Sequence, residues 1–346
     1  MSTLVPVPPL GVSRERPEGQ ALLEIRDLVV DFITPRGPAR AVDHVSLSIA
    51  PGEVFGLAGE SGCGKSTIAF SIMRLIKPPG VISGGQIIFK GQDVLALNTE
   101  GLRKFRWDRV SIVFQSALNS LNPVITMGEQ IIDAILAHER MSRHQAMERA
   151  AEMMKLVGID SRRLKSFPHE LSGGMRQRAV IAIALALNPE MVIMDEPTTA
   201  LDVVVQRDIL QQIQDLQQQF GFSILFITHD LSLLVEFSTR IAIMYAGKIA
   251  ELAAADELFV RPKHPYTVGL MNSFPSITGE KKKLQGIPGS PPDLVTPPPG
   301  CRFADRCLHV RPYHRQVEPA LREVSAGHQV ACHLYEEGNP IASAEL

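Results

Sequence analysis

Residues 59–66 read GESGCGKS and match the pattern G-x-x-x-x-G-K-[ST]. An apolar run, EVFGLAG, leads into this segment, and TIAFSIMRLI follows it with the apolar spacing of a buried helix. Glycines in such a turn let successive backbone N–H groups converge on an anion at the start of the helix. The chain is therefore constrained to place a strand, a tight loop and a helix, in that order, around a phosphate site.

The loop offers side-chain contacts to a nucleotide as well as backbone ones. Lys65 is expected to reach the β- and γ-phosphates, and the Ser66 hydroxyl is expected to bind Mg²⁺. The loop residues predicted to contact the nucleotide are Gly59, Ser61, Gly62, Cys63, Gly64, Lys65, Ser66 and Thr67. The segment thus predicts a site for a triphosphate with its metal.

A pair of acidic residues ends an apolar strand further along the chain. Asp195 and Glu196 directly follow MVIM and precede PTTALD. A carboxylate at the carboxyl edge of a sheet can join a magnesium shell, and this is the role expected of Asp195. The alternative interpretation is a plain polar turn, and the position of the pair among the other motifs favours the magnesium site.

The order of predicted elements indicates an α/β core. Residues 22–58 read as strands separated by Gly and Pro, and residues 116–180 change to mostly helix. We interpret the helical stretch as a subdomain inserted into the core. Helices and strands then alternate again, with a helix predicted over 203–220 and a strand over 223–228. This alternation predicts a parallel sheet covered on both faces.

Composition narrows the classes of protein to which the chain can belong. The 346 residues are 45% hydrophobic and 21% charged, enough for one sizeable α/β core and a smaller appendage. A formal net charge of -2 gives no reason to expect a nucleic-acid partner. Residues 1–21 contain no apolar signal region and are expected to be a disordered leader. The apolar run at 179–187 is about half the ~20 residues that a spanning helix needs, so any membrane role is expected to go through partners.

Together with the phosphate loop and the acidic pair, LSGGMRQ at 171–177 and ITHD at 227–230 make the chain resemble the ATP-binding-cassette (ABC) family. The resemblance covers 22–260. It implies an α/β P-loop ATPase with a mixed or parallel sheet, flanking helices, a β-rich subdomain and a helical subdomain at about 116–180. A small C-terminal extension over 261–335 and a tail over 336–346 follow this nucleotide-binding domain.

The resemblance also implies roles for individual residues. Glu196 would polarise the attacking water, and His229 would hold the γ-phosphate. Gln115, in VFQS, would join Ser66 and Asp195 at Mg²⁺ and link the metal site to the helical subdomain. Phe32 aligns with an aromatic residue that stacks on adenine, and a plain strand-face phenylalanine is the alternative.

In this family ATP is enclosed between two subunits, and the signature segment of one subunit completes the site of the other. The residues expected to reach the partner's nucleotide are Ser172, Gly173, Gly174, Gln177 and Asp202. No internal repeat is visible, so the second ATPase must be another chain, similar or identical to this one. Opening and closing of the dimer would drive two transmembrane permease subunits, which dock near SALNSLNPV at 116–124.

The C-terminal part resembles the extension of oligopeptide and dipeptide importer ATPases. The segments that carry this resemblance are RPKHPYT, IPGSPPDL, GCRFADRC and GHQVACHLY. HPYT, at 264–267, is expected to be a packing motif. In relatives four cysteines of the extension hold an iron–sulfur cluster, whereas here the third position is a histidine. The ligand set would be Cys301, Cys307, His314 and Cys332, for a [4Fe-4S] cluster or Zn²⁺, and free thiols without metal are the alternative.

These features favour the ATPase subunit of a di- or oligopeptide importer at the cytoplasmic face of the membrane, with an extracytoplasmic solute-binding protein in the complex. The AVDHVSL and ITPRG stretches favour the first member of a pair of different ATPases. Oligosaccharides or nickel are alternative solutes. A soluble ABC ATPase without a transport role is the competing class, but the chain lacks the second cassette, coiled-coil arm or basic face typical of it.

Overall fold

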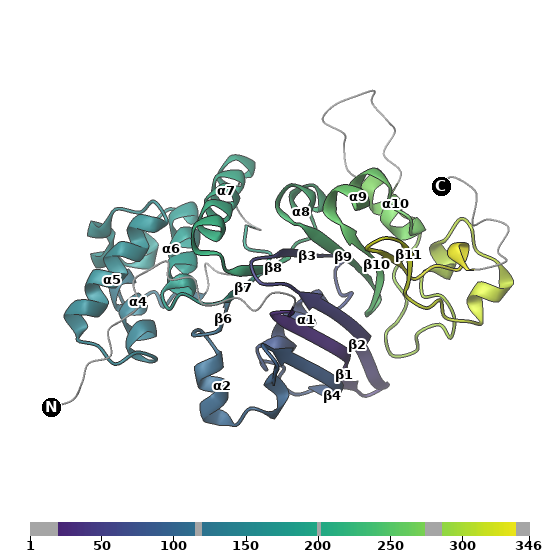
Figure 1. Ribbon diagram of the computed structural model, residues 1–346, viewed down its shortest axis with the longest axis horizontal. Helices are drawn as coiled ribbons and strands as arrows, with labels where there is room; N and C mark the ends of the chain where they lie inside the picture. Colours follow the sequence, from purple (N-terminus) through teal and green to yellow (C-terminus); the bar gives the residue numbers. More distant parts are fainter. Residues whose placement is uncertain (1–19, 115–119, 199–201, 274–285, 337–346) are drawn as a thin grey trace. The chain divides into compact units, whose positions relative to one another are not determined.

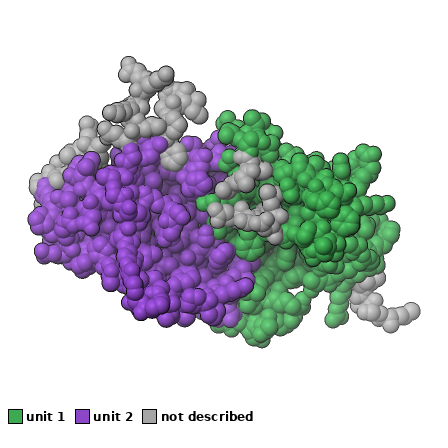
Figure 2. All heavy atoms as spheres, turned by 180° about the vertical axis from the view of Figure 1, so that it is seen from behind, with its two compact units in different colours: residues 1–22, 49–53, 96–225 green, residues 23–48, 54–95, 226–346 purple. Residues whose placement is uncertain are grey.

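The computed structural model describes residues 20–114, 120–198, 202–273 and 286–336. The chain forms two compact units, shown in different colours in Figure 2. Unit 1 comprises residues 1–22, 49–53 and 96–225, and unit 2 comprises residues 23–48, 54–95 and 226–346. The chain passes from unit 1 to unit 2 within one strand, β8 (Ser223–Ile227).

Unit 2 contains an antiparallel sheet built from the N-terminal strands (Figure 1). Its order is β2 (Gly37–Ile49), β1 (Leu23–Thr34), β4 (Gly80–Phe89) and β5 (Gln92–Asp93). β1 and β4 pair from Leu23 opposite Phe89 to Phe32 opposite Gly80, with a register shift beside Asp27, whose φ is 51°. The predicted β-rich region is therefore confirmed, and β4, which lies beyond the predicted range of 22–58, also belongs to it.

A second group of strands in unit 2 supports the phosphate loop. The buried strand β3 (Val54–Ala58) pairs in parallel with β9 (Arg240–Tyr245), and β9 forms a hairpin with β10 (Lys248–Ala254). Ala246 and Gly247 connect the hairpin with φ values of 47° and 87°, the left-handed backbone that a tight hairpin turn requires. The helices of this unit are α1 (Lys65–Ile72), α8 (Leu231–Phe237), α9 (Ala255–Val260) and α10 (Pro265–Asn272).

The C-terminal region continues this group of strands. β12 (His328–Val330) pairs antiparallel with β10, and β11 (Arg322–Ser325) pairs with β12. Glu251 of β10 is fully buried, and its carboxylate accepts from the backbone N–H groups of Lys263 and His264 at 2.7 and 2.9 Å and lies 2.7 Å from His328 Nε2. Two short strands of the C-terminal region therefore extend the pairing of β9 and β10.

Unit 1 consists mainly of helices around two parallel strands. β6 (Val110–Val113) pairs with β7 (Met191–Asp195), with Val110 opposite Met191. The helices among the described residues of this unit include α2 (Thr99–Phe105), α4 (Met127–Leu136), α5 (Arg143–Leu156), α6 (Gly173–Leu185) and α7 (Val203–Phe220). α4 buries Ile131, Ile132 and Ile135 on one face, in agreement with the helical spacing of its sequence.

Two features of the α7 sequence set its bounds. The Asp202 carboxylate accepts from the backbone N–H of Val205 at 3.0 Å at the start, and Gly221 ends the helix with φ 68°. The helix predicted over 203–220 is confirmed at both ends. The helix predicted over 67–76 is shorter, since it begins at Lys65 and ends at Ile72, before Arg74 with its φ of 49°.

No helix in the described part of the chain combines the length and the apolar character needed to cross a bilayer.

Candidate functional site

The phosphate loop in unit 2 depends on two glycines with positive φ. Gly59 and Gly64 have φ values of 142° and 109°. A Cβ added at Gly59 would lie 2.2 Å from the carbonyl oxygen of Met244, and one at Gly64 would lie 2.3 Å from that of Ala41. A side chain at either position would therefore clash with backbone, so the loop requires glycine at both.

Lys65 is turned into the loop that contains it. Its Nζ donates to the carbonyl oxygens of Gly59 and Glu60, at 2.7 and 3.0 Å, and lies 3.6 Å from the Cys63 sulfur. Burial is the main influence on Cys63 and raises the pKa of its thiol. These contacts place the Lys65 ammonium among the residues at the start of α1, where a helix N-terminus favours anions.

Two further predicted site residues belong to unit 2. Phe32 is half-buried on β1, opposite Gly80, where a Cβ would lie 2.9 Å from its ring. His229 is exposed and follows β8, immediately before Asp230, which caps α8. The other loop residues, Ser61, Gly62, Ser66 and Thr67, lie between the end of β3 and the first turn of α1.

Unit 1 holds the acidic pair at the carboxyl end of β7. Asp195 is the last residue of the strand and is buried, whereas Glu196 is half-buried and has a φ of 48°. A positive φ is strained for a residue with a side chain, and such strain persists where the surrounding structure fixes an unusual orientation.

The signature segment of unit 1 forms the start of α6. Ser172 is exposed and caps the helix by accepting from the Met175 N–H at 3.3 Å, and Gly173 and Gly174 form the first turn. No acidic side chain lies in this turn, so its N–H groups and positive helix end present an anion-binding surface. Gln177 is buried in the next turn of the helix, and its Nε2 has no hydrogen-bond partner among the described residues.

Two further predicted site residues are Asp202 and Gln115. Asp202 is exposed and caps α7, so its carboxylate has a local structural role. Gln115 lies outside the described residues, as do the first four residues of the SALNSLNPV segment, 116–119. Arg306 and Tyr266 were not predicted as site residues, yet both contact Glu60 of the phosphate loop.

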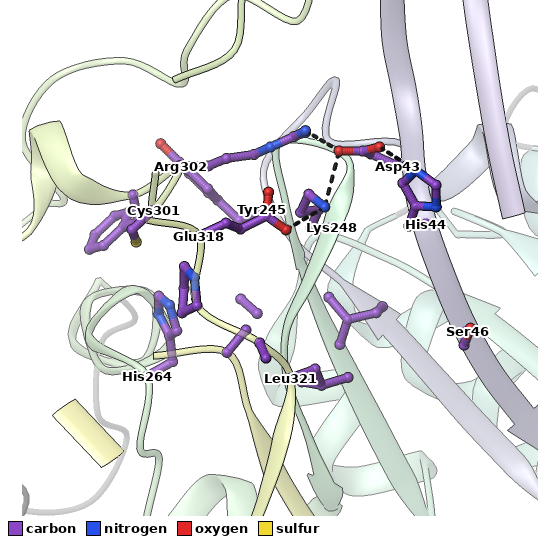
Figure 3. Close-up of a pocket in the computed structure, with 16 residues that line it drawn as sticks. Asp43, His44, Ser46, Tyr245, Lys248, His264, Cys301, Arg302, Glu318 and Leu321 are labelled. Atoms are coloured by element: carbon purple, nitrogen blue, oxygen red, sulfur yellow. Dashed lines mark hydrogen bonds and ion pairs between the residues drawn. The ribbon is translucent and has the colours of Figure 1, made fainter. Parts of the chain in front are cut away.

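A cavity of about 370 Å³ lies between β2, the β9–β10 hairpin and the C-terminal region of unit 2 (Figure 3). Asp43, which is buried in its wall, forms ion pairs with Arg302 and with Lys248 Nζ at 3.0 Å, and Lys248 also pairs with Glu318 at 2.6 Å. Burial opposes ionisation of Asp43, but Lys248, Arg302 and Arg40 outweigh it and lower the pKa of this carboxyl. The paired charges join the β-rich region to the C-terminal region.

The predicted metal ligands of the C-terminal region line a second, smaller cavity. Cys301, Cys307, His314 and Cys332 all face it. Burial raises the pKa of the Cys301 thiol to about 11 and that of the Cys332 thiol to about 12. Within the described ranges, however, no three His, Cys, Asp or Glu side chains are placed to hold a metal ion. His314 Nδ1 accepts from the Arg311 N–H at 3.2 Å, so in the neutral ring Nε2 carries the proton.

Family models and individual relatives both match this chain to ABC transporter proteins. Residues 42–199 match the ABC transporter family, and residues 250–313 match the oligopeptide/dipeptide transporter C-terminal region. The Probable peptide ABC transporter ATP-binding protein y4tR of Sinorhizobium fredii is 46% identical over 92% of this chain and 96% of its own. The Oligopeptide transport ATP-binding protein OppD of Bacillus subtilis is 43% identical over 92% of this chain and 90% of its own.

Solved structures agree with the fold. The dimeric post-hydrolysis state of the ATP-binding cassette MJ0796, bound to ADP and Pi, is 29% identical with a TM-score of 0.60. The match covers 67% of this chain and 98% of that one. The predicted α/β cassette fold is therefore confirmed.

Proposed function

Since this chain belongs to the oligopeptide/dipeptide ABC transporter ATP-binding proteins, we propose that its ATP hydrolysis powers the import of short peptides. The chain is an ATPase, and ATP with Mg²⁺ is the cofactor pair of its family. The observation that carries the peptide assignment is the C-terminal region, because residues 250–313 match the region that is described for oligopeptide and dipeptide transporters.

The proposed working unit is a dimer with ATP between the subunits. Ser172 is exposed and the first turn of α6 is half-buried in unit 1, where a second subunit's triphosphate could reach them. Val203 and Val204, beside Asp202, are 78% and 71% exposed, and apolar side chains at that exposure favour a protein contact. The solved cassette MJ0796 is itself dimeric. The second subunit is a copy of this chain or a similar ATPase.

In this proposal each site residue has its own role in ATP binding or hydrolysis. Lys65 and the loop amides bind the β- and γ-phosphates, Ser66, Asp195 and Gln115 hold Mg²⁺, and Glu196 polarises the attacking water. His229 contacts the γ-phosphate, and the partner's signature segment, with Gln177, closes the site. Phe32 stacks on adenine. Positioning and charge neutralisation account for most of the catalysis in phosphoryl transfer, so closure of the dimer is the step that permits hydrolysis.

The complex is proposed to lie at the cytoplasmic face of the cell membrane. Two transmembrane permease subunits and an extracytoplasmic solute-binding protein complete it, and the chain contacts the permeases through the region after Gln115. Oligosaccharide or nickel import by the same machinery is the alternative solute assignment.

Co-purification and reconstitution test the transport assignment. The chain should co-purify with the permease subunits encoded beside its gene. In proteoliposomes that contain the complex and its binding protein, di- or oligopeptides should stimulate ATP hydrolysis severalfold, because the loaded binding protein favours the closed dimer. Maltooligosaccharides and Ni²⁺, which represent the alternative solutes, are tested in the same assay for comparison. Stimulation by either of them and not by peptides would reject the peptide assignment, and failure to associate with any permease would favour a soluble ATPase.

The cysteine and histidine set of the C-terminal region gives a separate prediction. The four side chains share one cavity, but their present arrangement does not form the ligand shell of a single ion. The family resemblance predicts either iron with sulfide or about one Zn²⁺ per chain, bound through Cys301, Cys307, Cys332 and His314. Elemental analysis of anaerobically purified protein checks this. Protein that is metal-free yet as stable as metal-supplemented protein would show that the cysteines are ordinary thiols.

A further inference from the structure

We propose that Arg306 and Tyr266, both in the C-terminal region, are positioning residues for the phosphate loop and act on it through Glu60. This region is outside the cassette core that the ABC transporter family match covers. The inference rests on ATP binding by the loop and does not depend on which solute is transported.

Arg306 makes a two-pronged contact with Glu60. Its Nη1 and Nη2 donate to the two carboxylate oxygens at 2.7 and 2.9 Å, and the Arg306 side chain is only 5% exposed. Its Nε donates to the Pro288 carbonyl at 2.7 Å, and its guanidinium lies over the rings of Tyr245 and Phe303. A guanidinium fixed on three sides in this way holds the Glu60 carboxylate in one place.

Tyr266 forms a hydrogen bond with the backbone of Glu60. Its hydroxyl accepts from the Glu60 N–H at 2.9 Å, and its side chain is fully buried. The rings of Tyr245 and Phe303 pack against it, with centroids 4.6 and 5.4 Å away. HPYT is therefore a packing motif, as expected, but its tyrosine also carries a hydrogen bond to the phosphate loop.

These two contacts determine the shape of the loop because every polar group of Glu60 is engaged. The N–H donates to Tyr266, and the carboxylate accepts from Arg306. The carbonyl oxygen accepts from Lys65 Nζ at 3.0 Å and from the Cys63 N–H at 3.3 Å. Loss of Arg306 would leave a carboxylate without its partner beside the loop, and the Glu60 peptide would be free to turn. The backbone amides and Lys65 would then no longer be held in the orientation that a triphosphate needs.

Arg302, four residues before Arg306, supports the phosphate loop indirectly. Arg302 donates to the carbonyl of Ala246, in the β9–β10 turn, and the N–H of Gly247 donates to the Cys63 carbonyl at 3.0 Å. Arg302 and Arg306 both lie in the segment between Cys301 and Cys307. One short stretch of the C-terminal region therefore contacts the phosphate loop directly and supports it through the hairpin turn.

The test compares nucleotide binding and hydrolysis in the full-length chain and in variants. Arg306→Lys keeps the positive charge but cannot make the two-pronged contact with Glu60. Arg306→Met removes the charge, and Tyr266→Phe removes only the hydroxyl. Arg315→Ala is the control, because Arg315 forms an exposed pair with Asp305 in the same region. We expect Arg306→Met to raise the KM and the Kd for ATP about tenfold, the scale of a lost hydrogen bond to a charged group. Tyr266→Phe should raise both about threefold, and kcat should stay within about twofold in each variant.

The double variant Glu60→Gln/Arg306→Met distinguishes a shared pathway from general destabilisation. If Arg306 acts through Glu60, the double variant should bind ATP no more weakly than Arg306→Met alone. The inference is overturned if Arg306→Lys and Tyr266→Phe, folded by circular dichroism, bind ATP like the Arg315→Ala control. A lower Tm with unchanged ATP affinity would overturn it too. Absence of ATP binding in the unaltered chain would instead reject the nucleotide site itself.

Discussion

Glu196→Gln is expected to reduce steady-state ATP hydrolysis by about 10²- to 10⁴-fold, the usual contribution of a general base. Glutamine has almost the same shape but cannot accept a proton from the attacking water. ATP affinity should remain within about twofold, because the phosphate contacts belong to other residues. In the presence of ATP and Mg²⁺ the variant should accumulate as a dimer, measured by size-exclusion chromatography with light scattering, because the nucleotide that joins the subunits is no longer cleaved.

Glu190→Gln is the matched control for this experiment. Glu190 immediately precedes β7, whereas Glu196 follows it, and Glu190 pairs with Arg109 at 2.6 Å. Its replacement should cost at most about 1 kcal/mol of stability and leave turnover near that of the unaltered chain. Retained hydrolysis in Glu196→Gln would show that another group activates the water.

Ser172→Ala is expected to lower the rate of ATP hydrolysis by about 10- to 100-fold, since a hydroxyl that contacts a charged phosphate contributes about 1.5–3 kcal/mol. The proposed phosphate belongs to the partner, so the isolated chain should bind ATP as tightly as before. Specific activity of the unaltered chain should fall on dilution, because dissociated subunits lack the signature contact. Activity assays over a range of protein concentrations measure both effects.

Ser142→Ala controls for the loss of a helix cap. Ser142 caps α5 as Ser172 caps α6, and each hydroxyl accepts from the backbone N–H of the third residue of its helix. Removal of either cap should cost about 1 kcal/mol of stability, whereas only Ser172→Ala should affect hydrolysis. Equal activity losses in the two variants would attribute the effect to helix stability. Activity that is independent of dilution and of Ser172 would contradict the shared site.

Local signals in the sequence predict much of this molecule. The phosphate loop is recognisable because glycine is obligatory where a Cβ would meet backbone, as at Gly59 and Gly64. The helix α7 is predictable at both ends because a capping aspartate and a left-handed glycine mark them. The order of strands and helices likewise predicts the cassette fold, since the alternation reflects burial of both sheet faces.

Contacts between distant parts of the sequence could not be predicted in the same way. Glu60 and Arg306 are 246 residues apart, and neither lies in a periodic pattern that points to the other. The strand β12 spans only His328–Val330, too short for alternation to show, and it forms because β10 offers an edge. The left-handed backbone of Glu196 is also invisible in sequence, because the surrounding structure imposes it.

The pairing of β12 with β10 has a practical consequence for anyone who wishes to shorten or recombine this protein. The buried Glu251 carboxylate is hydrogen-bonded by Lys263, His264 and His328, which all follow residue 260. A truncated cassette ending there would leave the Glu251 carboxylate without these partners and the β10 edge without β12, and an open strand edge favours aggregation. Chimeras between relatives should therefore exchange β10 and everything after it as one piece.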